Sequence, residues 1–215
     1  MTAIPNDYRA ETCKALQNFS KRHPGQQDIA DTMLEFICNT PDCFERSQKS
    51  GHVTGSAWLV NPAGDKVLLT LHHKLGRWMQ TGGHADGDSN PLRVALREAG
   101  EESGIAGIEP MSPDIFDIDI HLIPARPEKE EPAHYHYDIR YLLQAPHENY
   151  IISPESDNLA WWGAGDFESR ATELDEAVLR MARRFFASFR ENASYSSTRH
   201  ARCVKYNTPT NNPHG

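Results

Sequence analysis

Apolar residues recur at helical spacing twice within the first fifty positions of the chain. The stronger set is Ile29, Met33, Phe36 and Ile37. An earlier and weaker set is Tyr8, Leu16 and Phe19. Pro24-Gly25 stands between the two sets, and this pair is typical of a turn. The pattern therefore predicts two helices at the start of the chain.

The middle of the chain changes to a strand pattern. Residues 52–60 and 66–73 are rich in β-branched and apolar residues and flank the turn sequence Asn-Pro-Ala-Gly, which predicts a hairpin. Residues 114–123 alternate between apolar and polar side chains, and residues 134–144 do the same, so each predicts a strand. A further short strand is expected at 159–162.

The last third of the chain is predicted to hold an amphipathic helix and a polar tail. The apolar positions at helical spacing within residues 168–190 are Leu174, Val178, Met181 and Phe185. From about Glu191 the chain is polar, and we expect a loosely held tail. Mixed strands and few helices, with the strands joined mostly by short turns, indicate an α+β fold or an α/β/α sandwich.

Charge and cysteine content narrow the class of protein. The net charge is −8 and no long run of Lys or Arg occurs, so we expect no duplex nucleic acid as a partner. No stretch is long and apolar enough for a spanning helix, so we expect no membrane partner. Four scattered cysteines without a Cys-x-x-Cys pair, and a start without a signal-peptide pattern, favour a cytoplasmic protein.

The segment 91–103 has clear helix boundaries. Asn90 is a favourable N-cap and Pro91 suits the first helical position. Gly104 accepts the left-handed conformation that ends a helix, and Ile105 can make the closing apolar contact. The stripe of this helix expected to face the core consists of Leu92, Ala95, Leu96 and Ala99.

Three glutamates, Glu98, Glu101 and Glu102, share a neighbouring face of this helix at spacings of three and four. Like charges at these spacings destabilise a helix by roughly 0.2–0.5 kcal/mol per pair. Two of the three also lie in the last turn, where the helix dipole disfavours negative charge. Arg97 can reach Glu101 and offset part of this cost. The spacing alone leaves two interpretations open, a solvated acidic face and a cradle for a divalent cation such as Mg²⁺.

The residues before the helix favour the second interpretation. The pattern Gly83-x5-Ser89-x7-Arg97-Glu98-Ala99-x-Glu101-Glu102-x-Gly104-Ile105 closely resembles the Nudix box of the Nudix hydrolases. That family's pattern is Gly-x5-Glu-x7-Arg-Glu-U-x-Glu-Glu-x-Gly-U, with U an apolar residue. Every fixed position matches except Ser89. The resemblance extends through residues 76–84 and 155–162, and it covers roughly residues 50 to 190.

The resemblance implies a fold and a division of the chain. The fold is an α+β, Nudix-type α/β/α sandwich with a mixed β-sheet, preceded by N-terminal helices. Residues 1–48 would form the helical extension, 49–190 the Nudix hydrolase domain and 191–215 the polar C-terminal tail. The N-terminal helices could cap the site or form the interface of a homodimer, and the sequence leaves this open.

The resemblance also implies an activity, which is the metal-dependent hydrolysis of a phosphoanhydride in a nucleoside diphosphate derivative by attack of water on phosphorus. Glu98, Glu101 and Glu102 would bind Mg²⁺ or Mn²⁺, with the Gly83 carbonyl as an additional metal ligand. Arg97 would orient the glutamates through salt bridges. The partner is then a small-molecule nucleotide substrate, whose identity the sequence leaves open.

Ser89 is the one departure from the box, because serine cannot replace a carboxylate as ligand or base. Asp86 and Asp88 lie in the same loop and are expected to compensate, so we expect activity to survive. An alternative is a noncatalytic, ligand-binding Nudix module. Another is an isoprenoid-diphosphate isomerase, which would need a cysteine near the pocket, yet none lies between Cys43 and Cys203.

Further polar residues share faces of the two predicted middle strands. His134, His136 and Asp138 alternate on one strand. Asp117, Asp119 and His121 alternate on the strand before it. They indicate a substrate pocket, a second metal site or a solvent-facing sheet surface. A zinc site is less expected, because no cysteine is near and no fourth ligand is obvious. The residues expected to line the substrate site are His84, Asp86, Asp88, Trp78, His121, His136 and Asp138.

Overall fold

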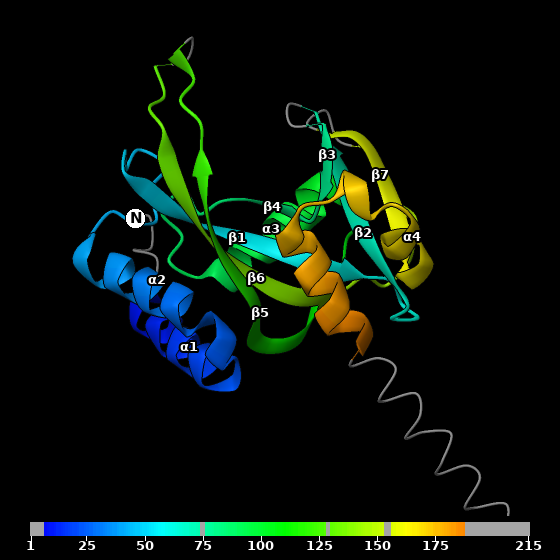
Figure 1. Ribbon diagram of the computed structural model, residues 1–215, viewed down its shortest axis with the longest axis horizontal. Helices are drawn as coiled ribbons and strands as arrows, with labels where there is room; N and C mark the ends of the chain where they lie inside the picture. The colour runs from blue at the N-terminus through cyan, green and yellow to red at the C-terminus, as the bar shows by residue number, and fades with distance from the viewer. Residues whose placement is uncertain (1–6, 74–75, 128–129, 153–155, 188–215) are drawn as a thin grey trace, which may run out of the picture.

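The computed structural model describes residues 7–73, 76–127, 130–152 and 156–187 (Figure 1). Its helices are α1 (Arg9–Arg22), η1 (Pro24–Gln26), α2 (Gln27–Asn39), α3 (Pro91–Ser103), α4 (Ala164–Ser169), η3 (Ala171–Glu173) and the helix 176–187. Its strands are β1 (Gly51–Val60), β2 (Lys66–His72), β3 (Arg77–Met79), β4 (Thr81–His84), β5 (Glu109–Ile123), β6 (His134–Gln144) and β7 (Ser156–Gly163).

The strands form one mixed sheet in the order β3-β2-β1-β6-β5, with β4 paired to β1 and β7 paired to β2. The β1–β6 pair is parallel along its whole length, whereas the other pairs are antiparallel. Every residue of β1 is buried, as expected for a strand with neighbours on both sides and layers on both faces. The fold is therefore α+β, as predicted.

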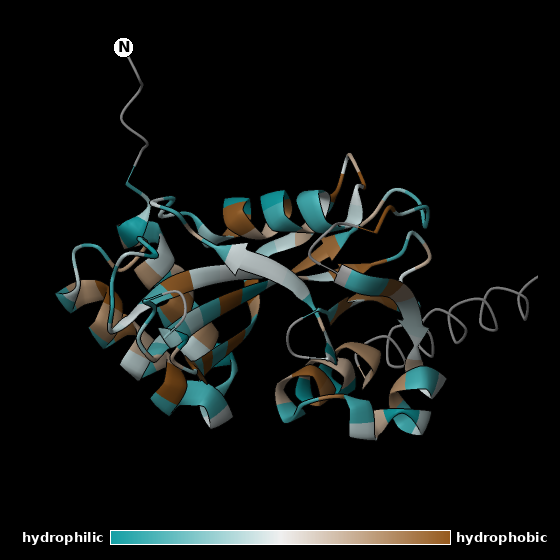
Figure 2. Ribbon diagram, turned by 90° about the horizontal axis from the view of Figure 1, so that it is seen from above, coloured by the Kyte–Doolittle hydropathy of each residue, from teal (hydrophilic) through white to brown (hydrophobic). Residues whose placement is uncertain are grey.

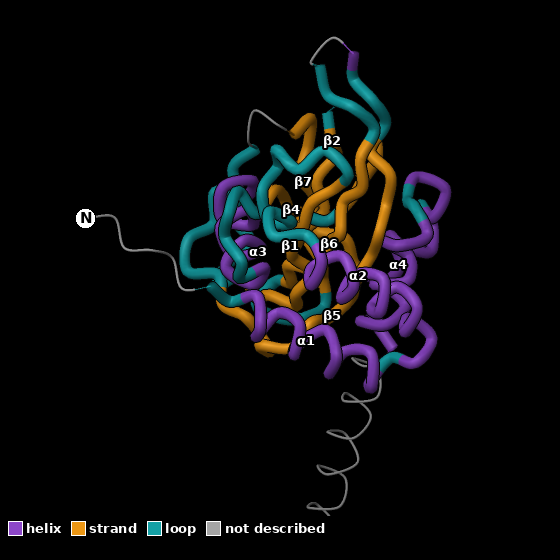
Figure 3. Tube along the Cα trace, turned by 90° about the vertical axis from the view of Figure 1, so that its left-hand side faces the viewer, coloured by secondary structure: helices purple, strands orange, loops and turns teal. Residues whose placement is uncertain are grey.

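Helices cover both faces of the sheet and give an α/β/α sandwich. On one face, Val94, Ala95 and Ala99 of α3 join a core that also contains residues of α1 and α2. On the other face, Val178 and Met181 of the helix 176–187 join a second core around Trp58 and Trp162. Figure 2 shows α3 and the helix 176–187 on opposite sides of the strands, and Figure 3 shows the strands between α3 and α4.

The two helices predicted at the start of the chain are confirmed as α1 and α2, and both lie beside β5 (Figure 1). Their buried residues, which include Leu16, Phe19 and Met33, belong to the same core as α3. The division at residue 48 stays a prediction, and the predicted tail 191–215 lies outside the described residues. No helix among the described residues is long and apolar enough to cross a bilayer.

The predicted strands and the helix 91–103 are confirmed, with corrections at some boundaries. β6 has the predicted ends, whereas β5 begins earlier, because Glu109 and Pro110 also pair with β6 before a register shift. The predicted hairpin of β1 and β2 exists, but its register is limited to Val60 opposite Val67, because β2 then pairs with β3 and β7.

The core stripe predicted for α3 was partly wrong. Leu92 and Leu96 are only partly buried, whereas Val94 is fully buried. Gly55 of β1 explains the difference, because a Cβ atom there would lie 2.6 Å from the Pro91 carbonyl oxygen and 2.8 Å from Val94 Cβ. The missing side chain lets α3 approach the central strand at this point and places Val94 against the sheet.

The prediction of a single helix within residues 168–190 was also wrong about where that helix begins. α4 and η3 precede it, and Leu174 lies before the helix 176–187. Asp175 explains the new start, because its Oδ1 accepts a hydrogen bond from the Val178 backbone N–H at 2.8 Å. This is the contact of an N-cap residue.

A buried ion network connects the second face of the sheet to the helix above it. Arg140, only 3% exposed, contacts Asp138 at 2.6 Å, Asp117 at 3.1 Å and Asp119 at 3.2 Å. Asp117, fully buried, also contacts Arg180 at 2.7 Å and Arg184 at 3.0 Å from the helix 176–187. Three acids and three arginines thus balance their charges inside the protein.

We predict that Arg140→Ala lowers the free energy of unfolding by about 3–5 kcal/mol, because it leaves buried carboxylates without their partner. The matched control is Arg183→Ala, whose side chain is 65% exposed and pairs with an exposed Glu176. An exposed pair of this kind contributes at most about 1 kcal/mol. Urea unfolding followed by circular dichroism measures both values. Equal midpoints and slopes for the two variants would contradict the role given to Arg140.

Candidate active site

A strand, a turn and a helix position the box residues. β4 ends at His84, and α3 begins after Asn90, whose side chain accepts hydrogen bonds from the backbone N–H groups of Leu92 and Arg93. At the other end, Gly104 adopts the left-handed conformation with φ of 68°, as predicted. Both caps fix the length of α3, and its last turns carry the three glutamates beside β4.

Two neighbouring glycines of β4 contact two of the glutamates, one by lacking a side chain and the other through its backbone. A Cβ atom on Gly83 would lie 2.4 Å from Glu98 Cδ, so only glycine leaves space for this carboxylate. The backbone N–H of Gly82 donates a hydrogen bond of 2.7 Å to Glu102 Oε1. The invariant glycine of the box pattern therefore has a direct physical role here, which is to accept the side chain of Glu98.

Arg97 holds the same arrangement from the helix side. Its Nη1 lies 2.8 Å from Glu98 Oε1 and 3.4 Å from Glu101 Oε2. Its Nη2 donates a hydrogen bond of 2.8 Å to the carbonyl oxygen of His84. The contacts agree with the orienting role that the resemblance implies. The Glu101 side chain is 62% exposed, whereas that of Glu98 is 15% exposed.

The donor chemistry of this site suits a hard divalent cation. Carboxylate oxygens are the side-chain ligands that Mg²⁺ prefers, and a site of one or two carboxylates leaves room for water and phosphate. The space that a Cβ atom would fill at Gly83 holds a carboxylate instead.

Ser89 serves a different purpose from the glutamate of the family pattern. Its side chain is buried, and its Oγ accepts a hydrogen bond of 2.7 Å from the backbone N–H of Tyr8. Its carbonyl oxygen accepts a second hydrogen bond, of 3.0 Å, from the Thr12 hydroxyl. The departure from the box therefore has a structural reason, since Ser89 anchors the start of α1.

The two acids expected to compensate for Ser89 are held by arginines. Arg46 contacts both carboxylate oxygens of Asp86, and this hydrogen bonding lowers the pKa of that carboxyl. Asp88 receives hydrogen bonds from Arg93 and from the backbone N–H of Asn90. These contacts give no support to the expectation that either acid replaces the missing glutamate.

Five histidines from four strands lie together on the sheet. They are His52 of β1, His84 of β4, His121 of β5, and His134 and His136 of β6. The His52 ring centroid lies 4.8 Å from that of His136, 5.0 Å from that of His84 and 5.0 Å from that of His134. The His121 ring centroid lies 5.4 Å from that of His136.

The sequence interpretation missed His52, because it opens a strand of mostly apolar residues. The available signal was the alternation of His52, Thr54 and Ser56, which puts three polar side chains on one face. Burial, together with nearby Arg46 and His52, lowers the pKa of His84 to about 4. Burial and the surrounding histidines lower the pKa of His136 to about 2. Both rings are therefore neutral at pH 7.

Two other predicted site residues have internal partners. Asp138 is buried and accepts hydrogen bonds from Thr54 Oγ1 at 2.9 Å and Ser56 Oγ at 2.7 Å, in addition to its contact with Arg140. Trp78 is buried and packs on Trp162, with ring centroids 5.3 Å apart.

One pocket in the described part of the chain lies apart from the glutamates. Its volume is about 540 Å³, and its walls are Leu71, Gly76, Arg77, Trp78, Arg170, Thr172, Glu173 and Leu174. No glutamate of α3 lines it. The structure thus groups Gly83, Arg97 and the backbone carbonyl of His84 with the box glutamates, whereas the His84 ring lies with the other histidines and Trp78 lies elsewhere.

Comparison with known proteins gives a partial sequence match and several structural likenesses. No family model matches the chain. A curated relative, the "Probable DHNTP pyrophosphohydrolase" of Lactococcus lactis subsp. cremoris (strain MG1363), is 31% identical over 80 residues. The match covers 37% of this chain and 47% of the relative, so the chain spans about half the length of the curated relative it matches.

Two solved structures illustrate the structural likeness. A hydrolase of the NUDIX family from Clostridium perfringens is 23% identical, with a TM-score of 0.46, and covers 64% of this chain and 97% of its own. A MutT protein from Methanosarcina mazei is 20% identical, with a TM-score of 0.48, and covers 67% of this chain and 97% of its own.

The likeness to the Nudix hydrolases lies in the residues of the box rather than in the overall similarity of sequence. Gly83 and the run from Arg97 to Glu102 have the box spacing, and the structure places them on a strand, a loop and a helix whose glycines and glutamates touch. The curated relative matches this chain over a segment of 80 residues. In these residues the chain resembles the Nudix hydrolases.

Proposed function

We propose that this chain is a metal-dependent hydrolase that cleaves a phosphoanhydride in a nucleoside diphosphate derivative. The observation that carries the proposal is the fit of Glu98 to the space left by the missing side chain of Gly83, beside the hydrogen bond from the Gly82 N–H to Glu102. A solvated acidic face would have no need of a strand without side chains at this point. The contact is the expected consequence of a site in which carboxylates must converge at a strand end.

Glu98, Glu101 and Glu102 would hold Mg²⁺ or Mn²⁺, with the Gly83 carbonyl as a further ligand. When bound, the metal would neutralise charge on the phosphate oxygens and lower the pKa of a water molecule. Arg97 keeps the glutamates in place through its contacts with Glu98, Glu101 and the backbone of β4. A glutamate carboxylate accepts the proton of the attacking water.

The reaction exchanges one bond to phosphorus for another. The oxygen of water forms a new bond to one phosphorus of the anhydride, and the bond from that phosphorus to the bridging oxygen breaks. The bridging oxygen leaves with the other phosphate, and the proton taken by the carboxylate returns to solvent. No oxidant or second substrate is required.

The name of the curated relative suggests one substrate to test. That protein is described as a pyrophosphohydrolase of DHNTP, so this compound belongs in a substrate panel beside nucleoside diphosphate derivatives. Cys13, Cys38 and Cys43 are free thiols, which supports the proposal of a cytoplasmic location. A homodimer through the N-terminal helices stays an open alternative.

A noncatalytic ligand-binding module is the second candidate, and the role of Ser89 favours it. The family's first glutamate is replaced by an anchor for α1, and Asp86 and Asp88 are engaged by arginines. Such a module would bind the substrate class without cleaving it. The isomerase has no support from Cys43, whose thiol is buried and accepts a hydrogen bond from Arg9.

We predict that the wild-type chain releases phosphate or pyrophosphate from at least one compound of the panel with Mg²⁺ or Mn²⁺. Glu102→Gln should lower kcat/KM by about 10²- to 10³-fold, because it removes one charge that acts on the transition state. Glu109→Gln, an exposed glutamate of β5, is the matched control and should retain activity. No cleavage with tight binding would favour the ligand-binding module, and equal rates for Glu102→Gln and wild type would exclude the mechanism.

We predict that Gly83→Ala lowers activity by about 10²-fold or more, because the added methyl group displaces the Glu98 carboxylate. Gly25→Ala is the control, because a Cβ atom there meets nothing within 4 Å. Both variants should keep the far-ultraviolet circular dichroism of the wild type. A Gly83→Ala enzyme with wild-type kcat/KM would contradict the need for contact between β4 and Glu98.

We predict that Ser89→Ala keeps wild-type kcat/KM and lowers the free energy of unfolding by about 1 kcal/mol, through loss of its hydrogen bond to Tyr8. Thermal unfolding and the same release assay measure the two effects. A large loss of activity with unchanged stability would show that Ser89 takes part in the reaction, contrary to its assignment as an anchor.

A further inference from the structure

We propose that His52, His84 and His136 form a binding site for a transition-metal ion of the Zn²⁺ type. One ring nitrogen from each residue lies within 4.8 Å of those from the other two. Among the described residues, no other group of three or more His, Cys, Asp or Glu side chains meets this condition. The proposal is independent of the proposed hydrolase activity.

The sheet itself assembles the three rings. In the parallel pair of β1 and β6, His52 lies opposite His136. His84 of β4 lies opposite Thr54, two residues along β1 from His52, so its ring reaches the same face. Because the three residues come from three adjacent strands, the site does not depend on a loop. Strand positions of this kind hold ligands more precisely than loops do.

The rings need only a modest adjustment to bind an ion. Zn–N bonds of about 2.0–2.1 Å at a tetrahedral angle separate two ligand nitrogens by about 3.3 Å. The nitrogens of the triad therefore need to approach one another by about 1.5 Å at most, which side-chain rotation can supply.

A second observation that indicates a ligand is the lack of hydrogen-bond partners for the buried ring of His52. This side chain is 2% exposed, and neither of its ring nitrogens has a hydrogen-bond partner among the described residues. The backbone of Gln48 approaches the ring without reaching hydrogen-bond geometry. Nε2 of His136 is also buried without a partner. A buried polar group without a hydrogen-bond partner destabilises the fold, and a bond to a metal ion would remove that cost.

This site is distinct from the one formed by the glutamates. Gly83 faces α3, because a Cβ atom on it would meet Glu98. The next residue, His84, faces the opposite side of the sheet, since successive strand residues alternate. The donors also differ in kind. Imidazole nitrogens suit Zn²⁺, Co²⁺ and related ions, whereas the carboxylates of α3 suit Mg²⁺ or Mn²⁺.

A further histidine, His134, lies next to the three, with its ring centroid 5.0 Å from that of His52 and 5.2 Å from that of His136. His134 Nδ1 donates to the Pro132 carbonyl oxygen at 2.9 Å, which leaves the lone pair on Nε2. That Nε2 is buried without a hydrogen-bond partner and lies 3.7 Å from Glu131 Oε1. His52 and His134 thus remove the objection that the sequence offered no fourth ligand for zinc.

The experiment uses Co²⁺ as a spectroscopic substitute for Zn²⁺, with the full chain in excess Mg²⁺ so that the glutamate site is saturated. We expect visible absorption typical of four-coordinate Co²⁺ that reaches its maximum at one ion per chain and disappears when Zn²⁺ is added. His84→Asn should weaken Co²⁺ binding by more than about 100-fold, because loss of even an outer partner of a metal ligand costs 10- to 100-fold.

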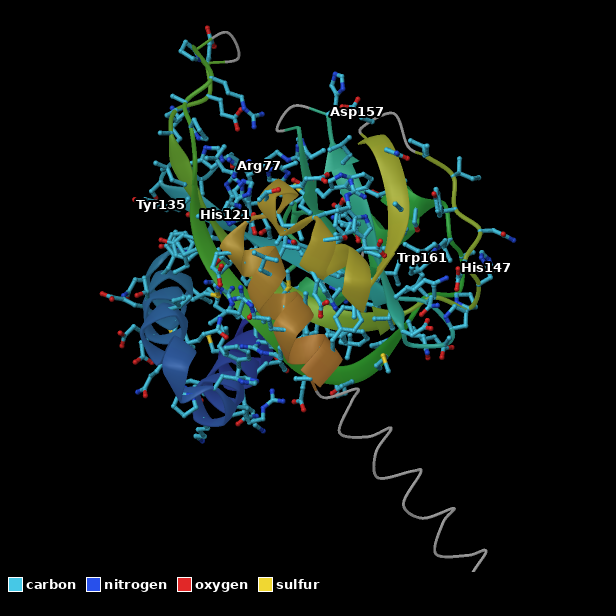
Figure 4. All side chains as sticks on the ribbon, turned by 45° about the vertical axis from the view of Figure 1, so that its right-hand side comes forward. Arg77, His121, Tyr135, His147, Asp157 and Trp161 are labelled. Atoms are coloured by element: carbon cyan, nitrogen blue, oxygen red, sulfur yellow. The ribbon has the colours of Figure 1, made fainter. Side chains whose placement is uncertain are left out.

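Two controls separate this site from other sources of the signal. His147→Asn should leave Co²⁺ binding unchanged, because His147 is exposed and lies on the opposite side of the molecule from His121 (Figure 4). Glu102→Gln should also leave it unchanged, because the glutamates are a separate site. Loss of the absorption in Glu102→Gln, or its survival in His84→Asn, would overturn the proposal.

A thermal measurement keeps the proposal testable if His84→Asn does not fold. One equivalent of Zn²⁺ should raise the Tm of the wild-type chain in the presence of Mg²⁺, since an ion that binds only the folded state stabilises it. An unchanged Tm together with no Co²⁺ absorption would show that the histidines pack without a metal.

Discussion

The buried positive charge of Arg140 is the constraint on which the sandwich depends. A guanidinium that is 3% exposed can remain inside the protein only with acids around it, and Asp117, Asp119 and Asp138 supply them. These acids raise the pKa of Arg140 against the effect of burial, which lowers it. Because Asp117 also binds Arg180 and Arg184, the same network fixes the helix 176–187 on the sheet. Arg184 continues it to Gln26, next to α2.

The alternation of strand residues gives the sheet two chemically different faces. On the face toward α3, glycines of β1 and β4 let a helix approach and accept a carboxylate. On the opposite face, the residues between them present histidines, hydroxyls and the Arg140 network. Two adjacent residues of β4 show the difference, because Gly83 faces Glu98 of α3 whereas the ring of His84 lies beside His52 on the opposite face. Two kinds of metal chemistry can therefore exist in one small domain without competing for ligands.

Ser89, the one residue that departs from the box pattern, is hydrogen-bonded to the start of the helix α1. The serine is short enough to receive the backbone N–H of Tyr8, and Thr12 bonds to the same residue's carbonyl. A glutamate at this position would need the space in which the chain enters α1. The helical extension thus packs against the loop of the box and joins the core shared with α3. The gain is a larger core, and the loss is one carboxylate near the site.

Much of this protein was determined by the sequence alone, because local patterns carry it. The caps at Asn90 and Gly104 set the ends of α3, and the alternation in residues 134–144 set β6. The box spacing gave the hypothesis of a glutamate site and the resemblance to the Nudix hydrolases. Long-range pairing decided the rest. Only the parallel register of β1 and β6 put His52 beside His136, and only the approach of α3 at Gly55 buried Val94 in place of Leu92. Likewise, the partners of Ser89 and Asp86, which are Tyr8 and Arg46, lie far away in the sequence, and a local pattern cannot predict such contacts.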